Sequence, residues 1–185
     1  MRFALLFLVG CKTRQLADPS PQIVTNLVEA SPEPPEASAA PLDSGPPVVE
    51  FVLSRGMCFG VCPEYTVTIE NDGTIAYEGR KFVAKHGRVK DAISAADVQA
   101  LAKKFDAANF FQLDVPKNCD RMVTDSPTFV ISERKNGLLH EVTHYSGNMC
   151  APDALDTLEE AIDEAAKTSR WVRCGKQPND FCDRP

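Results

Sequence analysis

Two cysteines, Cys58 and Cys62, form the motif with the most distinctive chemistry in this sequence. A cysteine thiolate with a lowered pKa attacks disulfides, so a closely spaced pair could be a redox centre. Thioredoxin-like centres use the spacing CxxC at a helix N-terminus, whereas this pair has the spacing CxxxC and lies between two predicted strands. We therefore expect a structural disulfide that closes a turn, with a thiol–disulfide oxidoreductase or redox sensor as the alternative function.

The other cysteines also indicate disulfides. The chain has seven cysteines, and six remain once Cys11 is set aside for the reason given below. An even number in an exported chain is typical of a disulfide framework. Many pairings are possible, and we favour Cys58–Cys62, Cys119–Cys150 and Cys174–Cys182. The first and third pairs are close in sequence, and the second would brace two loops that flank one hairpin. Zinc is less expected, because the spacing is not that of a CxxC…CxxC site.

The residues before Cys11 are typical of an export signal. One basic residue, Arg2, precedes an unbroken apolar run from Phe3 to Val9, and the sequence LVGC at 8–11 resembles the lipobox of bacterial lipoproteins. The run is too short to span a bilayer, which takes about 20 residues of helix, but it fits the apolar core of a signal peptide. We predict a palmitate-type lipid on Cys11 and a cell-envelope location facing the periplasm or surface, with the outer membrane slightly favoured. The alternative is an apolar N-terminus docked on the domain, with Cys11 as an ordinary buried thiol.

Composition excludes one class of partner and divides the chain. The net charge is −6 at pH 7, and no cluster of basic residues is present, so a nucleic-acid partner is not expected. Residues 11–47 are rich in Pro, Ala, Ser and Glu without a hydrophobic period, which predicts a disordered tether. We therefore expect a signal peptide over 1–10, this tether, one folded domain over 48–172 and a short cysteine-containing tail over 173–185.

Two hairpins can be placed with their register. Residues 64–70 alternate between apolar and polar, and a three-residue loop with a left-handed Gly73 pairs Ile69 with Ile75 on the apolar face of the next strand. Asn136-Gly137 predicts a two-residue turn between strands at 127–135 and 138–145. This turn sets Ile131 against Val142 and Phe129 against His144.

Two helices complete the predicted domain. Ser94 and Asp97 form a capping box at the start of the first helix, which ends near Asn109. Apolar residues at helical spacing after Pro152 predict the second helix. Because hairpins are followed by helices, we expect an α+β domain with an antiparallel sheet of about five to six strands and two helices packed on one face.

The segment MCFGVCPEY at 57–65 resembles the CFGxCPxY signature of a bacterial domain of unknown function, DUF6438. The later sequence TDSPT at 124–128, the Asn136-Gly137 turn, and Ile162-Asp163 followed by Trp171 are similar to later landmarks of that family. The similarity covers about residues 48–172. It implies an envelope domain that is often found on lipoproteins and has no established activity or cofactor. The four cysteines from Cys119 onward are additions to this pattern.

Three residues are candidates for a binding site. Arg55 lies near the cysteine pair, where its charge would lower a thiol pKa or pair with an acid. Tyr65 closes the family signature. Asp125 stabilises a turn before the strand that Pro127 directs, or acts as a base or ligand in a pocket with Arg55.

Metal and cofactor sites are not expected. His140 and His144 share one face of a predicted strand, which is a possible metal geometry, but apolar neighbours share that face. The acidic face of the second helix is expected to be solvated; it comprises Asp156, Glu159, Glu160, Asp163 and Glu164. We therefore expect a lipid-anchored module of the cell envelope with a non-catalytic binding or structural role. Its expected partners are the membrane, through the lipid on Cys11, and an envelope protein or glycan.

Overall fold

The computed structural model describes residues 48–175 and residue 182. The predicted signal peptide (1–10), lipid site (Cys11) and tether (11–47), and most of the predicted tail (173–185), lie outside the described residues. Within the described part of the chain, no helix is long and apolar enough to cross a membrane.

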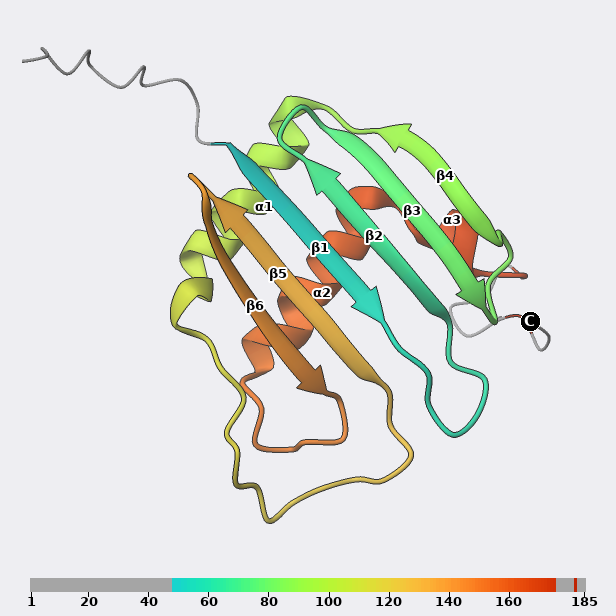
Figure 1. The fold of residues 1–185 in the computed structure, drawn as a ribbon, viewed down its shortest axis with the longest axis vertical. Helices are drawn as coiled ribbons and strands as arrows, with labels where there is room; N and C mark the ends of the chain where they lie inside the picture. Colours follow the sequence, from blue (N-terminus) through green and yellow to red (C-terminus); the bar gives the residue numbers. More distant parts are fainter. Residues whose placement is uncertain (1–47, 176–181, 183–185) are drawn as a thin grey trace, which may run out of the picture. The chain divides into compact units, whose positions relative to one another are not determined.

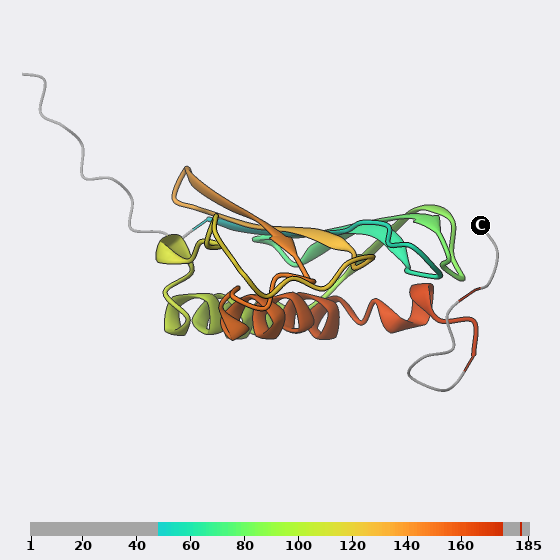
Figure 2. The ribbon, with the colours of Figure 1, turned by 90° about the horizontal axis from the view of Figure 1, so that it is seen from below.

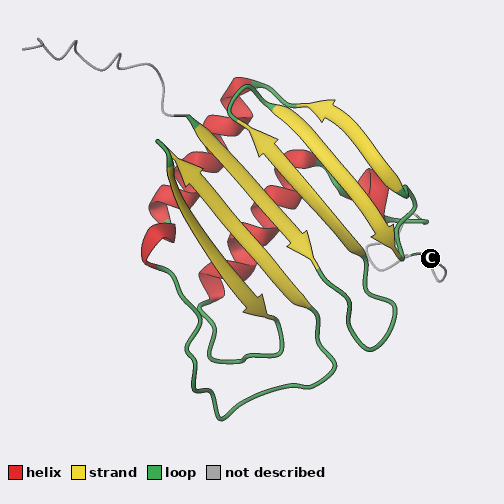
Figure 3. Ribbon diagram, viewed as in Figure 1, coloured by secondary structure: helices red, strands yellow, loops and turns green. Residues whose placement is uncertain are grey.

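Six antiparallel strands form one open sheet in the order β4-β3-β2-β1-β5-β6 (Figures 1 and 3). The strands are β1 (Val49–Arg55), β2 (Glu64–Glu70), β3 (Thr74–Lys81), β4 (Gly87–Ala92), β5 (Thr128–Lys135) and β6 (Leu138–Tyr145). β1 lies at the centre, paired with β2 on one side and β5 on the other. The expected α+β class is confirmed.

Both predicted hairpin registers are confirmed. Ile69 pairs with Ile75 across a loop in which Gly73 has a φ of 86°, and Ile131 pairs with Val142 across the Asn136-Gly137 turn. A shift of one residue would turn each apolar set to the opposite face of the sheet, so burial of one face selects the register.

Both long helices cover the same face of the sheet (Figure 2). They are α1 (Ala95–Ala107) and α2 (Asp153–Ala166), and two short elements accompany them, η1 (Phe110–Gln112) and α3 (Ser169–Val172). The predicted capping box is present: the Ser94 side chain accepts from the backbone N–H of Asp97, and the Asp97 carboxylate accepts from the backbone N–H of Ser94. It satisfies two of the N–H groups that a helix start leaves without partners.

The core fills the space between the sheet and the helices. Phe51 of β1 packs against Phe105 of α1, with ring centroids 4.7 Å apart, and both are fully buried. At the other end of the core, Trp171 packs on Tyr77, with ring centroids 4.8 Å apart. A backbone bond of 2.8 Å from Lys85 to the Trp171 carbonyl joins this end to the loop after β3.

All three favoured disulfides are present. Cys58–Cys62 closes the loop between β1 and β2, and Cys119–Cys150 joins the loop after η1 to the loop between β6 and α2. Cys174–Cys182 ties the chain that follows α3. In the chain-entropy account, a crosslink such as Cys119–Cys150, which spans 31 positions, stabilises a fold by about 3–4 kcal/mol.

Candidate functional site

Four side chains form a row across the covered face of the sheet. Arg55 is the cross-strand partner of Tyr65 on one side and of Phe129 on the other. Phe129 is in turn the partner of His144 on the edge strand β6. Since opposed residues point to the same face, β2, β1, β5 and β6 each contribute one side chain to a continuous line beneath α2.

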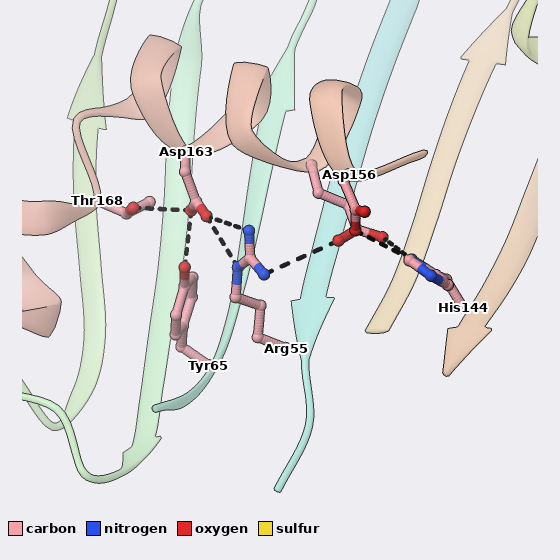
Figure 4. A network of polar contacts seen from close by, with 7 residues as sticks. Arg55, Tyr65, His144, Asp156, Asp163 and Thr168 are labelled. Atoms are coloured by element: carbon pink, nitrogen blue, oxygen red, sulfur yellow. Dashed lines mark hydrogen bonds and ion pairs between the residues drawn. The ribbon is translucent and has the colours of Figure 1, made fainter. Parts of the chain in front are cut away.

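The helix α2 crosses this row and presents three carboxylates to it (Figure 4). Asp156, Glu159 and Asp163 are spaced by three and four residues, which places them on one side of a helix. The expectation that this acidic face is solvated is wrong for Glu159, whose side chain is 1% exposed, and for Asp163, which is half-buried. It holds for Asp156, Glu160 and Glu164, which are exposed.

Asp163 is the centre of the network. Its Oδ2 accepts from Nε and Nη2 of Arg55, both at 2.8 Å. Its Oδ1 accepts from the hydroxyl of Tyr65 at 2.8 Å and from the hydroxyl of Thr168 at 2.7 Å. One carboxylate thus joins β1, β2 and the connection between α2 and α3. Burial and the neighbouring Asp163 charge raise the pKa of Tyr65 well above its usual value, so its hydroxyl remains a donor.

The Arg55 guanidinium has further partners in the row. It lies over the ring of Phe129, with 4.5 Å from Cζ to the ring centroid, a favourable cation–π arrangement. Its Nη1 is 3.9 Å from Oε2 of Glu159. Burial opposes the charged form, but the carboxylates of Asp163 and Glu159, together with Tyr65, raise the pKa of Arg55 overall. The guanidinium therefore stays charged and is held by protein groups.

The second centre is the pair His144–Glu159. Nδ1 of His144 donates to Oε1 of Glu159 at 2.9 Å and is 3.8 Å from Oδ1 of Asp156. The hydrogen bond to Glu159 raises the pKa of His144 against the opposing effect of burial. Burial likewise raises the pKa of Glu159, while the bond to His144 counteracts that rise. The hydrogen bond therefore favours the protonated form of His144 beside the carboxylate of Glu159.

An open cleft of about 640 Å³ lies beside the network. Its walls come from the disulfide loop after β1, the start of β5, and the end of α2 with the chain that follows. They include Gly56, Cys62, Pro63, Pro127, Lys167 and Arg173, and Arg55, Tyr65 and Asp163 line it as well. The polar network therefore borders the cleft through residues whose hydrogen bonds are already made within the protein.

The structure brings two of the three predicted site residues together. Arg55 and Tyr65 meet at Asp163, whereas Asp125 is exposed and does not line the cleft. The Asp125 backbone carbonyl accepts from the N–H of Phe59 at 3.2 Å. Its side chain accepts from the hydroxyl of Thr124 at 3.4 Å. Asp125 thus lies where two loops meet.

The two histidines of β6 do not share a site. Nε2 of His140 is 2.8 Å from the carbonyl of Leu113, and its ring packs edge-on against Phe110. His144, in contrast, faces the carboxylates of α2. Glu159, Asp163 and Thr168 belong to the network but were not among the predicted site residues. A signal for Glu159 exists: it lies four residues after Leu155 and three before Ile162, within the buried stripe of α2.

These features define a two-layer α+β domain whose helix α2 is joined to the sheet by buried charge pairs. The family model described as a domain of unknown function, DUF6438, matches residues 49–166. The chain belongs to this family. None of the curated proteins compared with the chain matches it.

We predict that the His144–Glu159 pair makes the stability of the fold pH-dependent. The folded protein binds the His144 proton more tightly than the unfolded chain, whose histidine has its ordinary pKa of 6.5. The pair therefore stabilises the fold fully below about pH 6.5, and this stabilisation is lost as pH rises through the raised pKa. Urea unfolding of the oxidised protein between pH 5.5 and 9 measures it.

The matched variants are His144→Gln and His140→Gln, two changes on the same strand. The fall in unfolding free energy with rising pH is expected to disappear in His144→Gln and to remain in His140→Gln. A decline of equal size in all three proteins contradicts the assignment to His144.

Proposed function

We propose that this protein is a lipid-anchored module of the cell envelope that binds another envelope protein and has no catalytic role. The observation that carries the proposal is an exposed apolar surface at one end of the sheet, on loops that two disulfides hold in place. We call it the braced apolar surface. It consists of Met57, Phe59, Val61, Met122, Val123 and Met149.

The braced apolar surface is concentrated on three loops. They connect β1 to β2, η1 to β5 and β6 to α2, and all lie at the same end of the sheet (Figure 1). Six of the nine exposed large apolar side chains among the described residues belong to it, and Phe59 is 88% exposed. Such clustering is typical of an interaction site, whereas apolar residues scattered singly on a surface are ordinary.

Backbone hydrogen bonds and disulfides fix these loops to one another. Phe59 N–H donates to Asp125, Val123 N–H to Gly147 and Met149 N–H to Arg121, at 2.8–3.2 Å. The disulfides Cys58–Cys62 and Cys119–Cys150 close the same loops. A surface that is ordered before binding loses less conformational entropy when a partner docks. Methionine side chains adapt to an apolar partner, which favours a protein over a glycan.

The polar network supports binding over catalysis. Arg55, Tyr65, Thr168 and Asp163 satisfy one another, so they do not present reactive groups to the cleft. One observation favours the second candidate, thiol–disulfide exchange: Cys62 lines the cleft. It ranks lower because neither Cys58 nor Cys62 begins a helix in the described part of the chain, the position that most lowers a thiol pKa.

Export and lipidation are supported by the sequence LVGC at 8–11 and by the three disulfides, which are typical of oxidising compartments. In cells grown with labelled palmitate, the protein is expected to take up label, and Cys11→Ser is expected to abolish it. Globomycin, which blocks the lipoprotein signal peptidase, should cause an unprocessed precursor to accumulate. An expressed wild-type chain without label would refute the anchor.

Binding through the braced apolar surface is tested by site-specific photocrosslinking in the cells that make the protein. A photoreactive phenylalanine analogue at Phe59 is expected to yield an adduct of one defined mass. The matched control is the same analogue at Leu138, which is also exposed but begins β6 at the other end of the sheet. Adducts of equal yield from both positions, or none from Phe59, would contradict a dedicated surface.

A further inference from the structure

Three potential metal ligands converge where α2 crosses the edge strand β6. One imidazole nitrogen of His144 and one carboxylate oxygen each from Asp156 and Glu159 all lie within 4.8 Å of one another. They come from a strand and a helix that are both fixed in the core. His144 and Asp156 flank the β6–α2 loop that carries Met149 of the braced apolar surface, but the cluster takes no part in the proposed function.

The spacing of the three atoms is close to that of a metal centre. Nδ1 of His144 is 2.9 Å from Glu159 Oε1 and 3.8 Å from Asp156 Oδ1. Ligands bound to one tetrahedral Zn²⁺ at about 2.0–2.1 Å are about 3.3 Å apart. The two distances from His144 thus lie on either side of that value, and the third is at most 4.8 Å.

Glu159 carries a second indication of a ligand. Its side chain is 1% exposed, and its Oε2 has no hydrogen-bond partner within residues 48–175 and 182. The nearest cation, Nη1 of Arg55, is 3.9 Å from that oxygen. A buried carboxylate oxygen without a hydrogen bond is costly, and a carboxylate that turns toward a bound ion relieves this cost. Asp156 provides access, since its side chain is 64% exposed.

We propose that His144, Asp156 and Glu159 form a binding site for a divalent transition-metal cation such as Zn²⁺. One imidazole with two carboxylates suits these ions better than Mg²⁺ or Ca²⁺, which prefer oxygen ligands alone. Two carboxylates balance the charge of the ion, while Arg55 keeps its partner Asp163. Three protein ligands leave one position for water on the exposed side of Asp156.

The cation replaces the proton that His144 and Glu159 hold between them. When His144 is cationic, binding releases its Nδ1 proton to solvent, Nε2 keeps its own proton, and the freed Nδ1 lone pair binds the metal. The charged groups that face His144 are Glu159 and Asp156 of α2 and Arg55 of β1, so no other described acid takes up the released proton. Affinity for the cation consequently falls as the pH is lowered.

The test is a calorimetric titration of the full-length oxidised Cys11→Ser chain, stripped with a chelator, with Zn²⁺. The Cys11→Ser change removes the one cysteine outside the three disulfides. One ion per chain is expected to bind, as read from the equivalence point of the titration. Saturation should also raise the thermal midpoint.

Single substitutions test which side chains bind the ion. His144→Ala and Glu159→Gln are expected to weaken Zn²⁺ binding at least tenfold, and His140→Ala on the same strand to leave it unchanged. Because the first two changes alter buried groups, Asp156→Asn provides the deciding measurement if they fail to fold. It alters an exposed ligand and should retain the fold while weakening binding. The absence of Zn²⁺ binding by the parent chain, or binding that Asp156→Asn leaves unchanged, overturns the proposal.

Discussion

The carboxylate of Asp163 is the interaction on which the arrangement of this domain depends. An arginine that folds beneath a helix must be paired, because an uncompensated buried charge costs several kcal/mol. Asp163 provides that pairing for Arg55, and it also accepts from Tyr65 and Thr168. One side chain therefore holds α2 against β1 and β2, and through Thr168 it also holds the connection between α2 and α3. The position of α2 in turn determines where Glu159 and Asp156 meet the sheet.

Charge alternates along the line where α2 crosses the sheet. Asp163 pairs with Arg55, Arg55 approaches Glu159, and Glu159 pairs with His144. The aromatic ring of Phe129 lies between the two basic side chains, which keeps them apart while it contacts both. The network is thus bound to four strands. It supports the start of β5 and the end of β1, from which the disulfide-closed loops of the braced apolar surface emerge.

Features that depend on neighbouring residues follow from the sequence. The two hairpin registers are set by the alternation around Gly73 and Asn136-Gly137, and the capping box by the spacing of Ser94 and Asp97. Two of the disulfides join cysteines a few residues apart. Arg55 alternates with the buried Phe51 and Leu53, so its inward direction can also be predicted. Its partner could not be predicted, because Asp163 lies 108 positions away and α2 carries six acids.

The short helices and the role of Asp125 likewise cannot be predicted from neighbouring residues alone. η1 and α3 have too few residues for a periodic pattern, and they form where Phe110 and Trp171 enter the core. Asp125 has the residue type of a ligand, yet its loop turns it away from the cleft and toward solvent. Which acids face inward is decided by how α2 crosses the sheet, and that crossing depends on packing between distant segments.

A double-mutant cycle between Arg55 and Asp163 tests the central claim most directly. Unfolding free energies of Arg55→Met, Asp163→Ala and the double variant give the coupling energy between the two side chains. The more exposed pair Arg134–Glu50, with 3.5 Å between Nε and Oε1, provides a matched cycle on the same sheet. A coupling of about 2–3 kcal/mol for Arg55–Asp163, against less than about 1 kcal/mol for the exposed pair, is the predicted result. Equal coupling in the two cycles would contradict the account.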